Sequence, residues 1–330
     1  MATFGATHNH QTRTVAHRLG VFLQRMNSPL FGYFPQHTIR RCVLLAALAV
    51  LSSCVAAPEI PPVFDSDDEG VANSVHSAPL VYLQEPFDSD DFRSHFHWTG
   101  SNQFVSISST PDSARAGPVL RVEIPSGNHL GANFAWRFKD HTVREPDRLY
   151  SRYFVYFEPG WESGQGGKLP GPSGTYRRAG WGGRSADGTN GWSARMGFKQ
   201  GFGKETTQLT YYAYYPDSGQ RYGKSIYWDR TASLLALDSV GELKHGRWYC
   251  IESYIRLNDP QQSDGLLIGW VDEALATYSN SLRFRTTAEL LIEEYWFNVY
   301  FGGKAVPTSD LIVYFDDLVL SDTRLGCSTP

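Results

Sequence analysis

Two strand-like runs carry polar side chains that could meet on one face of a sheet. Around Ser193 and Arg195, apolar residues alternate with polar or small ones, so a strand would bury one side and present a hydroxyl beside a guanidinium on the other. A second alternating run places the phenols of Tyr212 and Tyr214 on one side, about 7 Å apart by the strand rise. Together these side chains could bind and protonate a sugar acid.

A glycine-rich segment, Gly-Gly-Lys-Leu-Pro-Gly at 166–171, adds Lys168 where the backbone can approach a ligand closely. This set suits β-elimination across C4–C5 of a uronic acid, which requires a neutralised carboxylate, removal of the C5 proton and protonation of O4. Arg195 can pair with the carboxylate in bidentate fashion. Either Lys168 or a tyrosine of lowered pKa can take the proton, and the other tyrosine can donate one to O4.

The elements that must position these residues are strands. From residue 79 to 327 the sequence shows short alternating runs bounded by Gly, Pro, Asn and Asp, which predicts an all-β, two-sheet jelly roll or concanavalin-like sandwich with a concave groove. Two segments, Ala232–Val240 and Thr287–Ile292, could form short helices. The clearest predicted strands are Val119–Ile124, Leu149–Phe157, Ser193–Phe198, Gln208–Tyr215, Trp248–Leu257, Leu266–Val271, Tyr295–Phe301 and Leu311–Leu320.

In this order, the segments resemble polysaccharide lyase family 14, β-jelly-roll enzymes that cleave alginate and related uronans by β-elimination. The resemblance covers about 149–320 and implies that Lys168, Ser193, Arg195, Tyr212 and Tyr214 occupy catalytic and substrate-binding positions. It departs from the family pattern at an expanded segment, 176–190. It is carried by Gly166–Gly171, Ser193-Ala194-Arg195, Tyr212-Ala213-Tyr214-Tyr215-Pro216, Gly246-Arg247-Trp248, Leu257-Asn258, Asp264-Gly265, Trp270-Val271-Asp272, Tyr300-Phe301-Gly302-Gly303 and Tyr314-Phe315-Asp316-Asp317.

Four further residues are predicted to bind substrate. Asn298 and Tyr300 share one face of a predicted strand, and Lys304 follows it. Arg184 belongs to the expanded segment and could line the groove; a solvated loop is the alternative. We expect no cofactor and no metal site, because the ten histidines are scattered along the chain.

The N-terminus has the pattern of an export signal. Arg40-Arg41 precedes an apolar run too short to span a bilayer, and Leu51-Ser52-Ser53-Cys54 resembles a bacterial lipobox. We therefore predict an export signal over 1–54, with a possible true start at Met26, lipidation at Cys54 and a flexible tether over 55–78. Because Val55 follows in place of Asp, outer-membrane anchoring is expected. Cleavage of an ordinary signal near alanines 56 and 57 is the alternative.

The remaining sequence features limit which other partners are expected. A net charge of −4 and a pI near 6.2 give no basic field for nucleic acid. The expected partner is an acidic polysaccharide, the membrane is reached through the lipid only, and we expect a monomer. Cys250 and Cys327 could form a disulfide in an oxidising compartment or remain buried thiols.

Two other functions would use the same fold. A lectin-like surface lipoprotein would keep the aromatic residues and the arginine but would not need Lys168 or paired tyrosines. A glycoside hydrolase would need two carboxylates facing one groove, whereas Glu293 and Glu294 are adjacent and would point to opposite faces of a strand. The product distinguishes the three, because only elimination leaves an unsaturated, ultraviolet-absorbing sugar.

Overall fold

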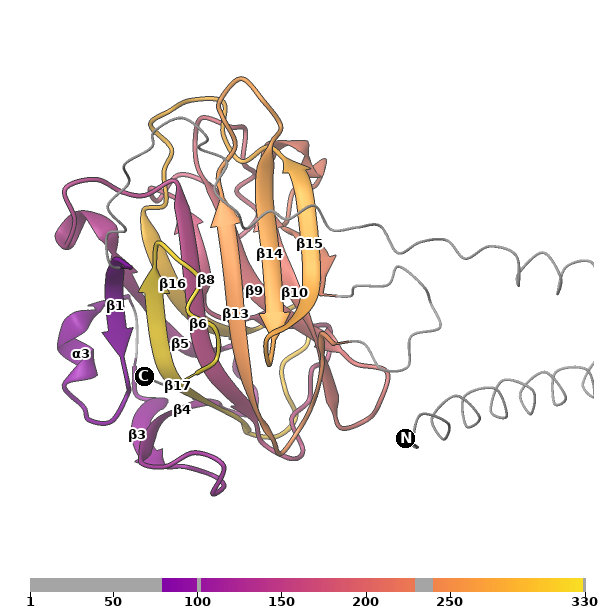
Figure 1. Ribbon diagram of the computed structural model, residues 1–330. Helices are drawn as coiled ribbons and strands as arrows, with labels where there is room; N and C mark the ends of the chain where they lie inside the picture. Colours follow the sequence, from indigo (N-terminus) through magenta and orange to yellow (C-terminus); the bar gives the residue numbers. More distant parts are fainter. Residues whose placement is uncertain (1–78, 100–101, 229–239, 329–330) are drawn as a thin grey trace, which may run out of the picture. The chain divides into compact units, whose positions relative to one another are not determined.

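The computed structural model describes residues 79–99, 102–228 and 240–328, and it forms two antiparallel β-sheets (Figure 1). The predicted export signal, Cys54 and the tether lie outside the described residues, as does nearly all of the segment Ala232–Val240. Within the described residues, no helix is both long enough and apolar enough to span a membrane.

An eight-stranded sheet forms one layer, in the order β15-β14-β13-β6-β17-β4-β3, with β1 also paired to β17. Its central strands are apolar on the side that faces the core. In β6, for example, every second residue from Leu149 to Phe157 is buried against the core. They are β1 (Val81–Glu85), β3 (Val105–Ser109), β4 (Pro118–Ile124), β6 (Arg148–Phe157), β13 (Trp248–Arg256), β14 (Gly265–Val271), β15 (Ala274–Leu282) and β17 (Leu311–Ser321).

A nine-stranded sheet forms the other layer, in the order β11-β10-β9-β7-β16-β5-β2. Here β12 pairs with β10, and β8 follows β7 between β9 and β16. The strands are β2 (His97–Trp98), β5 (Leu130–Arg137), β7 (Gly167–Lys168), β8 (Gly171–Gly174), β9 (Trp192–Gln200), β10 (Thr206–Tyr214), β11 (Lys224–Tyr227), β12 (Glu242–Lys244) and β16 (Glu294–Phe301); the short helices are α3 (Phe92–His95), η1 (Phe138–Asp140) and η2 (Pro216–Ser218).

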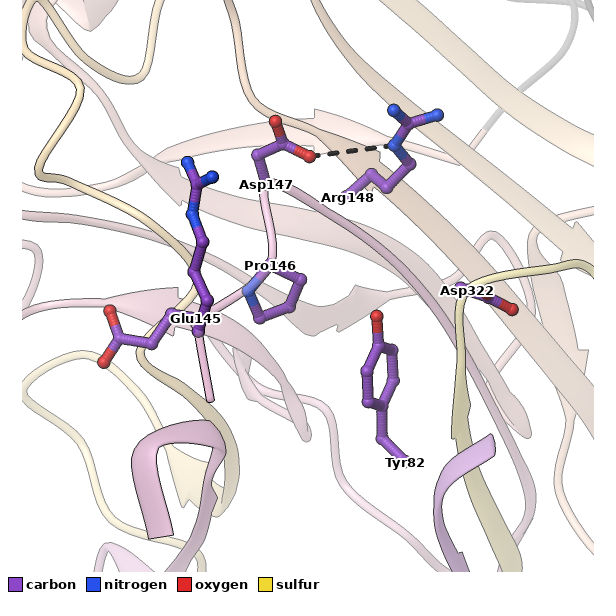
Figure 2. Close-up of a pocket in the computed structure, with 7 residues that line it drawn as sticks. Tyr82, Glu145, Pro146, Asp147, Arg148 and Asp322 are labelled. Atoms are coloured by element: carbon purple, nitrogen blue, oxygen red, sulfur yellow. Dashed lines mark ion pairs between the residues drawn. The ribbon is translucent and has the colours of Figure 1, made fainter. Parts of the chain in front are cut away.

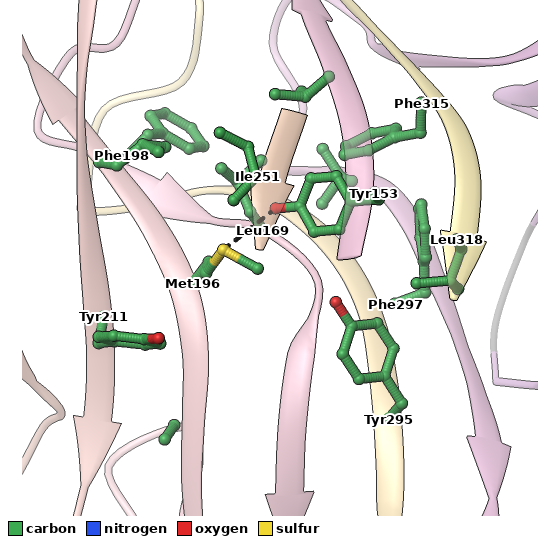
Figure 3. Close-up of a cluster of buried hydrophobic side chains, with 14 of the residues drawn as sticks. Tyr153, Leu169, Met196, Phe198, Tyr211, Ile251, Tyr295, Phe297, Phe315 and Leu318 are labelled. Atoms are coloured by element: carbon green, nitrogen blue, oxygen red, sulfur yellow. Dashed lines mark hydrogen bonds between the residues drawn. The ribbon is translucent and has the colours of Figure 1, made fainter. Parts of the chain in front are cut away.

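One hydrophobic core joins the inner faces of the two sheets (Figure 3). Phe297 of β16 meets Phe315 of β17 edge to face, with ring centroids 4.9 Å apart. Buried hydroxyls cross the same layer: Tyr211 donates to the carbonyl of Ile268 at 2.6 Å, and Tyr153 donates to a methionine sulfur of β9. The all-β sandwich expected from the sequence is confirmed.

Each of the eight clearest predicted strands is a strand of the structure, with ends shifted by at most two residues. The short helix predicted at Thr287–Ile292 is wrong, since this segment forms bends and a turn. Its backbone is held by other partners: the Thr287 hydroxyl accepts from the Glu289 N–H at 3.2 Å, and Arg285 donates to the carbonyl of Leu290 at 2.9 Å. Buried Leu290 and Ile292 anchor the segment to the core.

The tail after β17 crosses the outer face of the eight-stranded sheet. Cys327 is joined to Cys250 of β13 by a disulfide. Beside it, the buried carboxylate of Glu252 accepts from the Nε of Arg324 at 2.8 Å and from the backbone N–H of Gly326 at 3.2 Å. The tail is therefore fixed by covalent and charge-assisted contacts on the sheet opposite the catalytic candidates.

Candidate active site

The predicted catalytic residues lie on the outer face of the nine-stranded sheet, on three adjoining strands. Strand pairing places Lys168 of β7 opposite Tyr300 of β16. On the other side of β7, Arg195 of β9 lies opposite Tyr212 of β10. Residues far apart in the sequence are thus brought to one patch by sheet register.

Arg195 is the buried cation of this patch, with only 1% of its surface exposed. Its Nη1 donates to Asn298 Oδ1 at 2.7 Å, and its Cζ lies 3.9 Å from the ring centroid of Trp296. Among the described residues, its Nε and Nη2 have no hydrogen-bond partner. Burial lowers the pKa of Arg195 to about 10, so it stays charged at neutral pH. Two free donors on a fixed guanidinium suit a carboxylate.

Lys168 lies between two aromatic rings. Its Nζ is 4.5 Å from the ring centroid of Tyr300 and 4.9 Å from that of Tyr212. Burial, with further contributions from Arg195 and Lys199, lowers the pKa of Lys168 to about 7. Near neutral pH a large share of the amine is therefore neutral and able to accept a proton.

The glycines around Lys168 let β7 and β8 fit between β9 and β16. A Cβ on Gly167 would lie 2.2 Å from the carbonyl oxygen of Tyr300, and one on Gly171 would lie 2.6 Å from the Cα of Arg195. No side chain fits such distances without a backbone shift. The Gly-Gly-Lys-Leu-Pro-Gly segment therefore sets the position of the lysine through steric necessity.

The two predicted tyrosines are in edge-to-face contact, with ring centroids 5.7 Å apart. Burial, and the neighbouring phenol of Tyr214, raise the pKa of Tyr212, so it keeps its proton. The Tyr214 hydroxyl is buried and accepts from the backbone N–H of Gly183 at 3.3 Å. Tyr212 is the more exposed of the two and is better placed to donate a proton to a ligand.

The other predicted binding residues divide into two groups. Asn298 and Tyr300 lie on the same outer face of the nine-stranded sheet as Arg195. Ser193 also points to this face, but it is fully buried there and donates to the carbonyl of Gly180 at 2.7 Å. Arg184 is exposed on the loop, with its Cζ 3.8 Å from the ring centroid of Trp181. Lys304 is exposed beyond β16, and the structure shows no contact from its side chain to the described catalytic residues.

Four residues of this face were missed by sequence reasoning. Trp296 lies under Arg195 and donates from its indole to Asn133 Oδ1 at 2.7 Å. The ring of His129 stacks on Tyr300 at 5.4 Å, and Glu294 shares the face with Trp296. The two-residue period that selected Asn298 and Tyr300 would also have selected Trp296 and Glu294. No comparable signal marks Asn133 or His129.

A pocket of about 400 Å³ lies elsewhere, at the start of β6 (Figure 2). No residue of the catalytic face lines it. Across the described ranges, no group of three or more His, Cys, Asp or Glu could hold a metal ion. The pocket is lined by Tyr82, Arg144, Glu145, Pro146, Asp147, Arg148 and Asp322.

The fold, and the residues on the outer face of its nine-stranded sheet, define a β-sandwich enzyme. A lysine, an arginine and a tyrosine are positioned there for acid–base chemistry. The family model described as polysaccharide lyase 14 matches residues 112–318, so the chain belongs to polysaccharide lyase family 14. It is a lyase, and the resemblance of its motifs to this family is confirmed.

Solved alginate lyases share the fold. A variant of the alginate lyase Aly36B in complex with alginate tetrasaccharide has a TM-score of 0.56 and 20% identity, over 76% of this chain and 98% of that one. The alginate lyase from Aplysia kurodai has a TM-score of 0.50 and 21% identity, over 66% of this chain and 86% of that one. No curated protein sequence matches the chain.

Proposed function

We propose that this lyase cleaves a uronic-acid polysaccharide, with alginate as the first candidate, by β-elimination. The observation that carries the proposal is the meeting of Lys168, Arg195 and Tyr212 on one face, with a lysine of lowered pKa beside a buried guanidinium. The alginate bound to the structurally similar Aly36B variant supports the choice of substrate.

Each step of the elimination has a residue suited to it. Arg195, buried beside Lys168 with two unpartnered donors, supplies the positive charge that stabilises the C6 carboxylate when C5 loses its proton. The neutral amine of Lys168 takes that proton, and the C–H electron pair forms the C4–C5 double bond. The C4–O4 bond breaks, and Tyr212 donates its phenolic proton to O4. Solvent then restores the neutral amine and the phenol.

The raised pKa of Tyr212 and the lowered pKa of Lys168 favour one of the two assignments left open by the sequence. A base needs to be deprotonated at working pH and an acid protonated, which fits lysine as the base and tyrosine as the acid. The half-buried rings of Trp296 and Tyr300 contact Arg195 and Lys168 and hold these cations on the face.

The test is the product formed from a panel of acidic polysaccharides that includes alginate and glucuronan. Wild type should release unsaturated, ultraviolet-absorbing ends from at least one of them. Lys168→Ala and Arg195→Ala should each lower kcat/KM by at least about 10³-fold while remaining folded. The matched control is Lys244→Ala, an exposed lysine of β12. Retained activity in both variants would refute the assignment of Lys168 and Arg195 to the active site. If wild type binds a polysaccharide but releases no unsaturated product, a lectin-like function is favoured.

We also propose that the protein is exported and held at the outer membrane by a lipid on Cys54. The lipobox-like sequence supports this, and the Cys250–Cys327 disulfide suits an oxidising compartment. Labelling with a fatty acid should mark the wild type and not Cys54→Ser. Equal labelling of both would contradict the anchor.

A further inference from the structure

A second pair of charged side chains lies on the catalytic face, beside Arg195. Glu294 of β16 is directly opposite Arg137 of β5, and the Ser173 hydroxyl donates to Glu294 Oε1 at 3.2 Å. The side chains of Arg137 and Glu294 are 15% and 12% exposed. Both side chains are therefore largely buried but keep some exposed surface on this face.

This pair leaves the arginine incompletely satisfied. Arg137 Nε lies 3.8 Å from Glu294 Oε2, beyond hydrogen-bond distance, and among the described residues it has no hydrogen-bond partner. Burial and the adjacent Glu293 raise the pKa of Glu294 to about 7, against the opposing effect of Arg137 and Arg195. A partly neutral carboxyl cannot compensate a guanidinium fully, so Arg137 keeps attraction for an incoming anion.

Other cations gather at this end of the face. Burial lowers the pKa of His97, and Arg137 and Arg177 lower it further, with a smaller effect from Lys139. Asp140 is the acid that acts on His97 in the opposite sense. Three cations therefore surround His97, together with the carboxylate of Asp140, and the carboxyls of Glu293 and Glu294 lie at the start of the neighbouring strand β16.

The spacing matches a repeating ligand. The guanidinium of Arg195 reaches Trp296 and Asn298, whereas that of Arg137 faces Glu294. These contact points are two to four residues apart on β16, about 7 to 13 Å by the strand rise. Every sugar of a uronan carries a carboxylate, so one chain can supply an anion to each arginine.

We propose that Arg137 and Glu294 form a second substrate-binding position, which takes the carboxylate and a hydroxyl of another uronate on the same chain. The proposal rests on the proposed function and extends it to substrate length. A chain long enough to fill both positions gains a charge-assisted hydrogen bond to Arg137 that the shortest cleavable oligomer does not make. The carboxyl of Glu294 meets a sugar hydroxyl as donor or acceptor.

The experiment compares full-length wild type and Arg137→Gln on a polyuronate and on oligouronates of increasing length, with product absorbance as the readout. Arg137→Gln should lower kcat/KM on the polymer by about 10-fold or more, mainly through KM, since a charged hydrogen bond contributes about 1.5–3 kcal/mol. The loss should shrink at least about three-fold on the shortest oligomer that is cleaved. Glu294→Gln should retain more polymer activity than Glu294→Ala.

The matched control is Arg121→Gln, which breaks a comparable Arg–Glu pair with Glu123 on the other sheet. It should leave the length dependence unchanged. An equal loss on every length, or no loss on the polymer, would overturn the second position while leaving the lyase assignment intact. If wild type forms no unsaturated product, calorimetric binding of the polyuronate replaces kinetics: weaker binding by Arg137→Gln supports the position, and equal binding refutes it.

Discussion

At the residue scale, the proposed reaction requires the amine of Lys168 to be neutral although it lies next to the permanent cation Arg195. In the proposed mechanism Arg195 does two things at once: its charge stabilises the substrate carboxylate, and, after burial, it is the next contribution to the lowered pKa of Lys168. The substrate carboxylate works against the second effect, because a bound anion favours the charged amine. The same guanidinium therefore couples binding to proton removal.

The titration of Lys168 predicts the pH profile. In free enzyme the amine is protonated and inactive below its pKa of about 7, so kcat/KM should rise about 10-fold per pH unit up to that value and then level off. The limb for kcat should lie at higher pH, because the bound carboxylate raises the pKa of the amine. Rates measured from pH 5 to 9 provide the check, and equal activity at pH 5 and pH 8 would exclude lysine as the base.

The sequence predicts those site residues that lie in a recognisable local pattern. Alternation along one strand and a glycine-rich motif were enough to select Lys168, Arg195 and Tyr212. Arg137 was not selected, because its role depends on pairing with Glu294, which lies far along the chain and is placed opposite it only by strand register. Local patterns do not give such register.

At the element scale, the site depends on β7 and β8, two very short strands between β9 and β16. They carry Lys168, the proposed base, and leave room for Arg195 because glycines line their contacts. Elements of two and four residues are too short for periodicity to reveal, which explains why they were not predicted. The long strands were predictable because their core-facing residues repeat over seven or more positions.

Gly171→Ala tests the dependence on these short strands. The new Cβ would meet the Cα of Arg195, so β8 and β9 must separate, at a cost of about 1–3 kcal/mol in the free energy of unfolding. Displacement of the guanidinium should also lower kcat/KM by about 10-fold or more.

Chemical denaturation and product absorbance measure the two effects. Gly219→Asn is the control, because Gly219 has a left-handed backbone that Asn tolerates and a Cβ added there would meet no atom within 4 Å. If Gly171→Ala behaves like this control, close packing at Arg195 is not required.

At the scale of the whole molecule, the two sheets have separate tasks. The nine-stranded sheet presents the catalytic face, and the outer side of the eight-stranded sheet holds the tail through Cys327, Glu252 and Arg152. The core between the sheets separates these two surfaces. Changes to the tail should therefore alter stability with little effect on catalysis.

Replacement of both Cys250 and Cys327 by Ser examines this separation. The disulfide spans 77 residues, and its loss should lower the free energy of unfolding by about 2–4 kcal/mol. Activity at 25 °C should stay within about two-fold of wild type, because the bond lies on the opposite sheet. Denaturant midpoints and initial rates are the measurements; a large rate loss in a folded variant would show that the two surfaces are coupled.

The position of β17 has a consequence for how the chain is made. This strand lies between β6 and β4 and also pairs with β1, so it joins pieces of sheet that have no other strand linking them along that path. While the ribosome has yet to release residues 311–321, β4 and β6 expose unpaired edges that invite aggregation. The eight-stranded sheet therefore cannot be completed until residues 311–321 are available, and we expect this step to be slow because it depends on non-local contacts.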